Sequence, residues 1–318
     1  MIVMDMKICN PLISVLIPSY NHEKYVDACI NSILAQTYKE IEIVIIDDSS
    51  ADKTYERILM RKAELEKRFR KVIIKRNPRN MGVSRTLNLA LNEAKGEYIK
   101  LLASDDMLLP NALERMIDHI KKRQELSLVF SNGILIDDNQ MSYLLKEKND
   151  LIYANPPEFR PSLFERLYRG NCIAAPCAMF RGEVFKQLGG FDESIAIEDW
   201  EYMLRMAVNG CQIDYINETL VLYRRSETSV TNYQSSQNAE RKFIFMMENE
   251  LKILEKYAYV NRSLANEVIR NYCFMRFNLS SDNYFRDANR RIYQYMKTHD
   301  INPGLKRRIK YRLLQMEI

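Results

Sequence analysis

The chain has 318 residues, of which 47% are hydrophobic and 28% are charged, and its net charge is +5 at pH 7. This composition is ordinary for a globular protein and excludes intrinsic disorder, which combines low hydrophobicity with high net charge. The charge is too small for the dense basic face of a nucleic-acid-binding protein, so we expect no nucleic acid partner. It fits an anionic ligand that carries phosphate.

The sequence shows no sign of a membrane span or of secretion. No apolar run reaches the roughly 18 residues that a transmembrane helix needs, and the N-terminal segment carries Asp5 where a signal peptide would be cationic. The six cysteines include no CxxC pair and have no histidine at zinc-ligand spacing. We therefore expect a cytoplasmic protein with reduced, mostly buried thiols.

The first 130 residues alternate short β-branched segments with amphipathic helical patterns, which is typical of βαβ units in a mainly parallel sheet. In the first helical pattern, Val26, Ile30 and Ile33 recur at the spacing of one buried helix face. The predicted strands are 12–18, 41–47, 71–77, 97–102 and 126–131.

The second half of the chain predicts a different organisation. Residues 137–161 are polar and contain prolines, which indicates a long functional loop. A short helix, an apolar stretch, a helix over 198–208 and a strand-like segment then complete one α/β domain. From about residue 235 the pattern is charged and helical. We predict one domain over 1–234 and a helical region over 235–318.

Polar residues come directly after three of the predicted strands, where ligands of an open parallel sheet bind. They are Tyr20 with its neighbours Pro18, Ser19 and Asn21, the pair Asp47-Asp48, and the segment Ser104-Asp105-Asp106. Two carboxylates a few ångströms apart repel by about 4 kcal/mol at an effective dielectric near 20, and a divalent cation such as Mg²⁺ or Mn²⁺ relieves this. The alternative for either pair is a turn or an Asx cap, because aspartate is common there.

The first pair has an interpretation without metal. Asp48 can accept a hydrogen bond from a ring N–H of a nucleobase while Tyr20 stacks on the base. No GxGxxG comes after the first strand and no GxxxxGK[ST] occurs, so neither a Rossmann loop nor a P-loop is available for phosphates. We therefore expect a metal to neutralise a diphosphate.

Two long segments carry a resemblance to a known family. SVLIPSYNHEKYVDACINSILAQTYKEIEIVIIDDSSADKT and, after it, NMGVSRTLNLALNEAKGEYIKLLASDD resemble the GT-A family 2 glycosyltransferases, which are inverting enzymes with nucleotide-sugar donors. The resemblance covers residues 12 to about 230. It implies a GT-A fold, a Rossmann-like α/β architecture with a mainly parallel sheet flanked by helices, here with a C-terminal helical extension. It also implies a UDP-sugar as the first expectation for the donor and a glycan or lipid-linked oligosaccharide as the acceptor.

The resemblance also implies roles for single residues. Tyr20 and Asp48 would hold the base, usually uracil, with Pro18 beside them. Asp106, the last carboxylate of the DXD-like motif, would bind Mn²⁺ or Mg²⁺, and Asp105 would face the ribose or the sugar.

Two helices complete the predicted site. Arg85 and Asn88 fall on the helix that the family places near the donor, where Arg85 would contact phosphate or sugar; the alternative is a solvated helix face. In IEDWEYMLR (197–205), Asp199 matches the general base of the family. The alternative there is that Glu198 and Asp199 simply favour the positive end of a helix. A single displacement assisted by Asp199 would invert the anomeric centre.

One position departs from the family pattern. Many relatives carry a histidine in YRxHxxS near the diphosphate or metal, where this chain has Ser226. Metal or phosphate contacts would then rely on Arg224, Arg225 or water, and we expect His22, His119 and His299 to be ordinary surface or half-buried histidines. The alternative function is a nucleotide-sugar-binding module without turnover.

The C-terminal tail over 302–318 is a basic amphipathic segment. Leu305, Ile309 and Leu313 lie on one side, surrounded by lysine and arginine. This pattern fits peripheral contact with the cytoplasmic face of an inner membrane. The alternative is a terminal helix that docks on its own domain or on a second subunit of a homo-oligomer.

Overall fold

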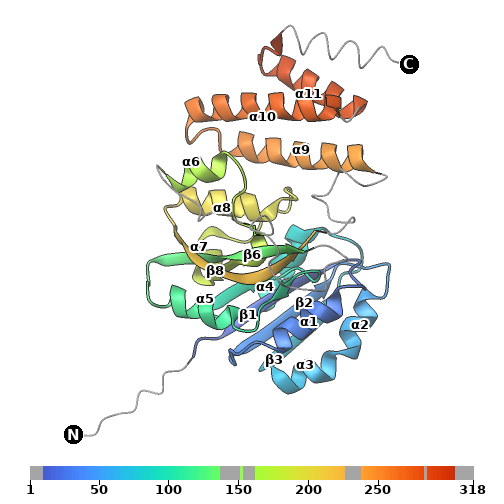
Figure 1. Ribbon diagram of the computed structural model, residues 1–318, viewed down its shortest axis with the longest axis vertical. Coiled ribbons are helices and arrows are strands. Elements are labelled where there is room, and N and C mark those ends of the chain that lie inside the picture. Colours follow the sequence, from blue (N-terminus) through green and yellow to red (C-terminus); the bar gives the residue numbers. More distant parts are fainter. Residues whose placement is uncertain (1–9, 137–150, 153–161, 226–237, 283–284, 305–318) are drawn as a thin grey trace, which may run out of the picture. The chain divides into compact units, whose positions relative to one another are not determined.

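The computed structural model describes residues 10–136, 151–152, 162–225, 238–282 and 285–304 (Figure 1). The chain divides into two compact units, with 1–159, 172–194 and 198–224 in the first and 160–171, 195–197 and 225–318 in the second. The predicted boundary at 234/235 lies outside the described residues. So does the predicted loop over 137–161, except for residues 151–152, where Leu151 bridges to Ile134.

An eight-stranded mixed sheet forms the centre of the first unit, with the order β3-β2-β1-β4-β7-β6-β8-β5. Parallel pairs join β1 to β2 and β4, β2 to β3, and β6 to β8, whereas β7 runs antiparallel to β4 and β6 and β5 runs antiparallel to β8. The five predicted strands are all present. The bounds are β1 Ile13–Ser19, β2 Ile41–Asp47, β3 Lys71–Arg76, β4 Tyr98–Leu101, β5 Met107–Leu108, β6 Leu126–Ile136, β7 Ala178–Arg181 and β8 Gln212–Arg224.

Helices cover both faces of the parallel strands. On one face, α1 (Val26–Leu34) and α5 (Ala112–Ile120) share a core with the odd-numbered side chains of β1 and β2. Side chains alternate between the faces of a strand, so the even-numbered ones face α4 (Val83–Glu93), which packs on β1 and β2. This double cover explains why both strands are almost continuously apolar. The other helices of this unit are α2 (Thr54–Met60), α3 (Lys62–Arg68), α7 (Glu183–Leu188) and α8 (Glu198–Val208).

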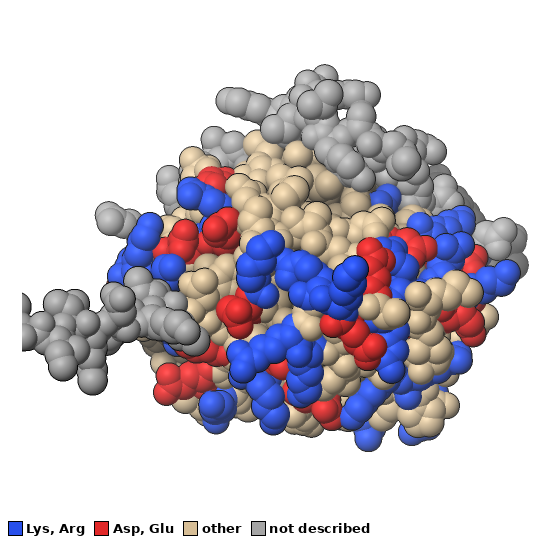
Figure 2. All heavy atoms as spheres, turned by 90° about the horizontal axis from the view of Figure 1, so that it is seen from below, with Lys and Arg blue, Asp and Glu red and all other residues tan. Residues whose placement is uncertain are grey.

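Charged side chains protect the open edge of the sheet. β3 is an edge strand, and its Lys71, Lys75 and Arg76 are exposed, which disfavours pairing with another chain. Figure 2 shows lysine and arginine gathered on the face that lies at the bottom of Figure 1, with acidic side chains among them. Exposed cations of this unit are paired with acids, as in Lys75 with Glu93 and Arg70 with Glu40. The surface therefore carries mixed charge rather than a uniform basic field.

The second unit is helical, as the sequence predicts. It contains α6 (Leu163–Tyr168), α9 (Ala239–Lys256), α10 (Arg262–Asp282) and α11 (Arg286–Thr298), and the last three run side by side in Figure 1. Phe243, Phe277 and Met296 are fully buried in their common core. α6 joins this unit through Tyr168, whose hydroxyl donates to the carbonyl of Leu254. No helix in the described parts of the chain is long and apolar enough to cross a membrane, and the tail over 305–318 lies outside them.

Candidate active site at the carboxyl edge of the sheet

The two loops after β1 and β2 are tied together by hydrogen bonds. The N–H of Asn21 donates to Ser50 Oγ (3.0 Å), the N–H of Ala51 donates to Asn21 Oδ1 (2.8 Å), and the N–H of His22 donates to Thr54 Oγ1 (2.8 Å). Asn21 (φ 54°) and Ser49 (φ 62°) adopt the left-handed conformation that non-glycine residues rarely take. Such strained residues concentrate at functional sites and persist where the surroundings fix them.

This pair of loops carries the predicted base-binding residues. Tyr20 comes directly after β1 and is 44% exposed, so its side chain is accessible to a ligand. Pro18 lies inside β1, half-buried, opposite Ile46 of β2. The structure thus brings Pro18, Tyr20 and Asp48 to one edge, because the N–H of Asp48 donates to the carbonyl of Ser19 (2.7 Å).

The charge of Asp47 is satisfied within the chain. Its buried carboxylate accepts hydrogen bonds from the N–H and hydroxyl of Ser50. Arg76 adds a positive charge, with Nε 3.2 Å from Asp47 Oδ2. Asp47 therefore needs no metal ion.

Asp48 fixes the beginning of α4. Its Oδ1 accepts from Asn77 Nδ2 (2.7 Å) and the N–H of Met81 (2.8 Å), and its Oδ2 accepts from the N–H of Gly82 (2.9 Å). Gly82 has φ 85° and caps the helix, which explains the glycine at this position. An ionised carboxylate offers about four acceptor sites, so three donors leave one for a ligand.

Asp106 is the least satisfied carboxylate of the predicted site. Its side chain is 1% exposed, and its Oδ1 accepts from the N–H of Arg224 (2.8 Å). Its Oδ2 is buried and has no hydrogen-bond partner among the described residues. Burial, and then the charge of Asp105, raise the pKa of Asp106 well above its ordinary value. A buried acceptor of this kind is a suitable ligand for a hard cation.

A short strand brings Arg224 to this segment. β5 begins directly after Asp106 and pairs with Leu222 and Val221 of β8, which places the end of β8 against Asp105 and Asp106. Arg224 also donates from Nε to the carbonyl of Asp105 (3.1 Å). The sequence pattern predicts only a helix after this segment and gives no sign of β5, because two residues are too few for a periodicity.

His22 lies against the same segment. Its Nδ1 is 2.8 Å from Ser104 Oγ and 3.6 Å from Asp105 Oδ1, and its side chain is 22% exposed. From the sequence we expect His22 to be an ordinary histidine. Its position three residues after β1 places it at the same sheet edge as Asp105. This position is the sequence feature that could have indicated a role of His22 in the site. Ser226, where the family histidine is expected, lies outside the described residues.

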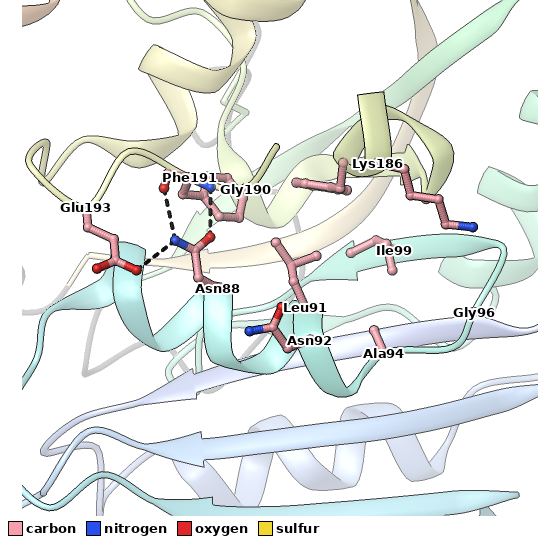
Figure 3. Close-up of a pocket in the computed structure, with 12 residues that line it drawn as sticks. Asn88, Leu91, Asn92, Ala94, Gly96, Ile99, Lys186, Gly190, Phe191 and Glu193 are labelled. Atoms are coloured by element: carbon pink, nitrogen blue, oxygen red, sulfur yellow. Dashed lines mark hydrogen bonds between the residues drawn. The ribbon is translucent and has the colours of Figure 1, made fainter. Parts of the chain in front are cut away.

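Arg85 and Asn88, the two α4 residues predicted near the donor, contact the 190–193 loop and not the loops after β1 and β2. Arg85 is half exposed, with Nε 3.7 Å from Glu193 Oε2. The amide of Asn88 donates to the carbonyl of Phe191 (2.9 Å) and to Glu193 Oε1 (3.1 Å), and its Oδ1 accepts from the N–H of Phe191 (2.8 Å). Asn88 therefore holds the 190–193 loop (Figure 3).

Asn88 also lines a pocket of about 500 Å³ between α4 and α7, together with Asn92, Gly96 and Lys186 (Figure 3). Gly96 precedes β4, so the pocket lies at the amino end of that strand. Asp105 and Asp106 come after its carboxyl end. The pocket is therefore separate from the predicted metal site.

Asp199 lies in the first turn of α8, as predicted. Its Oδ1 accepts from the N–H of Trp200 (2.7 Å), and Trp200 and Leu204 anchor the helix in the core. Burial, and then the charge of Asp199, raise the pKa of Glu198 to about 8. Two adjacent acids with unequal environments are a common arrangement for proton transfer.

These features fit a divalent cation at Asp105 and Asp106. No group of three or more His, Cys, Asp or Glu side chains that could hold a metal occurs in the described part of the chain. A cation there would take its other ligands from water or substrate oxygens, as Mg²⁺ commonly does with phosphates. A sheet covered by helices, with an exposed aromatic ring and an acidic segment at its carboxyl edge, places this chain in the class of α/β proteins that bind ligands at that edge.

Similarity to known proteins gives the family. The sequence model of glycosyl transferase family 2 matches residues 14–189. An uncharacterized glycosyltransferase of Methanocaldococcus jannaschii is 30% identical over 216 residues, which cover 67% of this chain and 71% of the relative. The chain belongs to glycosyl transferase family 2 and is a glycosyltransferase.

Solved structures give the same fold. S. aureus TarS, residues 1–349 in complex with UDP-GlcNAc, has a TM-score of 0.55 at 16% identity and covers 89% of each chain. The mannosyltransferase PcManGT of Pyrobaculum calidifontis, in complex with GDP-Man and Mn²⁺, has a TM-score of 0.59 at 14% identity. The match covers 94% of this chain and 78% of the PcManGT chain. The predicted GT-A fold is confirmed.

Proposed function

We propose that this chain transfers a sugar from a nucleotide-sugar donor to a hydroxyl of a glycan or glycolipid acceptor, with inversion at the anomeric carbon. In this proposal Asp106 and Asp105 hold a divalent cation. The nucleobase is bound by Pro18, Tyr20 and Asp48. Asp199 is the general base. Arg85 would contact the phosphate or the sugar of the donor only after its ion pair with Glu193 is broken. The acceptor and a membrane contact through the tail over 305–318 stay predictions from the sequence.

The buried Oδ2 of Asp106 carries this proposal. A buried polar atom without a partner costs roughly 1–3 kcal/mol, and more when it is charged. The cost is high here because Asp105 adds a second negative charge beside it. A cation would ligate the orphaned oxygen and favour the ionised form of both carboxylates, whereas without a cation Asp106 would favour the protonated form.

The donor is proposed from two neighbours of the same fold. TarS was solved with UDP-GlcNAc, and PcManGT was solved with GDP-Man and Mn²⁺. These complexes support a nucleotide sugar and a divalent cation, and they leave UDP and GDP both to be tested. The single acceptor site left on Asp48 Oδ2 suits one ring N–H of a base that stacks on Tyr20.

The chemistry would be divided between the residues of the chain and the bound cation. Asp199 takes the proton from the acceptor hydroxyl, and the oxygen attacks the anomeric carbon from the face opposite the nucleotide. A new C–O bond forms as the bond from that carbon to the diphosphate oxygen breaks, and the nucleoside diphosphate leaves with the electron pair. A bound cation supplies positive charge that stabilises the diphosphate as it departs. No covalent intermediate is required.

A donor panel tests the proposed function. Purified protein is incubated with UDP- and GDP-sugars and Mn²⁺, and release of the nucleoside diphosphate is measured. We expect slow release from one donor class and loss of release with a chelator and in Asp106→Asn. Donor binding without release across the whole panel, with or without metal, would leave a nucleotide-sugar-binding module instead of an enzyme.

A second variant tests the base. Asp199→Asn removes the proton acceptor but not the donor site, so we expect donor affinity within about twofold of wild type and transfer reduced by about 100-fold or more. Glu183→Gln, an exposed acid in the first turn of α7, is the matched control. Transfer by Asp199→Asn at the wild-type rate would show that another group is the base.

A further inference from the structure

His22 occupies a place that suits a ligand contact. His22 follows Tyr20 by two residues in the chain, and its Nδ1 lies 3.6 Å from the Asp105 carboxylate. In the proposed function these two residues bind opposite ends of the nucleotide, the base and the cation. The group that connects those ends in a nucleotide sugar is the diphosphate. A hydrogen-bond donor at the position of His22 would therefore reach the diphosphate.

Ser104 lies against one of the two ring nitrogens of His22. Its hydroxyl is fully buried, and its Oγ lies 2.8 Å from His22 Nδ1. We assign the hydroxyl as the donor to Nδ1, since a buried hydroxyl is generally hydrogen-bonded. Nδ1 then carries no proton in the neutral ring, and the proton lies on Nε2. Nε2–H points away from Ser104 on a ring that is 22% exposed.

The backbone of His22 is fixed from the other side. Its N–H donates to Thr54 Oγ1 (2.8 Å), and the Thr54 hydroxyl donates to Asp52 Oδ1 (2.5 Å). Tyr25 packs edge-on against the ring, with the centroids 6.0 Å apart. The ring is therefore held before any ligand arrives, which lowers the entropy lost on binding.

We propose that His22 binds the diphosphate of the nucleotide-sugar donor through Nε2–H, with Ser104 as the residue that fixes the ring and its tautomer. This inference rests on the proposed function. The competing explanation is that His22 only supports the loop through its bond to Ser104.

Two substitutions separate the two explanations. In His22→Asn the side-chain amide replaces Nδ1 and keeps the bond to Ser104, but nothing replaces Nε2. In His22→Gln the longer side chain places an amide N–H near the position of Nε2. A diphosphate contact predicts that glutamine restores binding, whereas a supporting role predicts that asparagine does. His119→Asn is the matched control, because His119 pairs with Asp214 away from the site.

The readout is calorimetric binding of UDP, GDP, uridine and guanosine in the presence of Mn²⁺, without turnover. For the diphosphate that wild type binds, we expect affinity to fall by about 10- to 100-fold in His22→Asn, the loss of one hydrogen bond to a charged group. We expect a loss of about threefold or less in His22→Gln, and unchanged affinity for the matching nucleoside in both. Thermal unfolding confirms that each variant is folded.

Three outcomes oppose the inference. Equal diphosphate affinity in His22→Asn and wild type would overturn it, and so would a parallel loss of nucleoside and diphosphate affinity. A His22→Asn variant that binds normally while His22→Gln does not would establish the supporting role. Wild-type protein that binds neither UDP nor GDP would instead overturn the proposed function itself, which keeps the two failures apart.

Discussion

The chain contains two adjacent aspartate pairs at the carboxyl edge of the same sheet, and their environments differ. Asp47 and Asp48 accept hydrogen bonds from Ser50, Asn77 and two backbone N–H groups, and Arg76 lies beside them. Asp106, one of the other pair, keeps a buried oxygen without a partner in the described residues. The same dipeptide thus forms a structural anchor at one position and a candidate metal site at the other.

The segments that lie against each pair cause this difference. The loop between β3 and α4 runs past Asp48, and Asn77, Met81 and Gly82 of that loop donate to its carboxylate. After Asp106 the chain enters β5, and the backbone groups of β8 pair with that strand. Among the residues that the structure describes, the N–H of Arg224 is the one donor to the Asp106 side chain. An acidic pair is therefore satisfied or left open by the backbone that surrounds it.

The largest expected effect is on catalysis. Asp106→Asn should reduce metal-dependent transfer by about 1000-fold or more, since a catalytic cation contributes several kcal/mol to transition-state stabilisation. Its free energy of unfolding in metal-free buffer should stay within about 1 kcal/mol of wild type, because asparagine keeps the acceptor for Arg224 and removes a buried charge. Activity and urea unfolding are measured on the same sample. A large loss of stability would mean that Asp106 is an anchor like Asp48.

Asp48→Asn should show the opposite behaviour. An amide cannot accept from all three N–H donors at this buried position, so we expect the free energy of unfolding to fall by about 2–4 kcal/mol. Urea denaturation measures this loss. Asp118→Asn, in a surface pair with Lys121, serves as the control and should change stability by less than about 0.5 kcal/mol. Equal stability of Asp48→Asn and Asp106→Asn would remove the contrast between the pairs.

Stabilisation of the folded protein by Mn²⁺ should depend on the Asp105-Asp106 pair and not on the Asp47-Asp48 pair. At a concentration 100 times its dissociation constant, the ion should raise the free energy of unfolding of wild type by about 2.7 kcal/mol. We expect this shift to persist in Asp47→Asn, whose carboxylate is already neutralised by Arg76, and to disappear in Asp106→Asn. Thermal unfolding with and without a chelator measures both. An unchanged shift in Asp106→Asn would place the ion elsewhere.

A third acidic pair, Glu198 and Asp199, should affect only the pH dependence of stability. Burial raises the pKa of Glu198 from 4.5 to about 8, so between these values the folded state holds more protons than the unfolded state and stability falls as pH rises. Glu198→Gln removes this proton, so its stability should fall less between about pH 5 and about pH 8. Urea unfolding over that range compares it with Glu183→Gln, an acid in the first turn of α7. Parallel profiles for the two variants would contradict the raised pKa.

Much of the site could be predicted from local sequence. The apolar runs of β1 and β2 are nearly continuous because helices cover both faces, and that continuity identified the strands and hence the residues at their ends. The amphipathic pattern of α8 placed Asp199 in its first turn. These features depend on periodicity within a single element, which the sequence carries directly.

Other features depend on contacts between distant segments. β5 exists because β8 offers it a partner, and His22 meets Ser104 because two loops end at the same edge. α6 belongs with α9 and α10, although about 70 residues separate it from them in the sequence. No local pattern encodes such pairings, since each partner is one of many surfaces of similar composition.

The sequence by itself determined the five strands of its first half, the buried helix faces, the order of the polar segments and, through them, the family. The tertiary structure decided which carboxylates are already satisfied, because hydrogen-bond satisfaction depends on donors supplied by other elements. That is why two identical Asp-Asp dipeptides look alike in the sequence and differ in the fold, where one is satisfied mainly by β3 and the loop after it and the other retains a buried oxygen for a ligand.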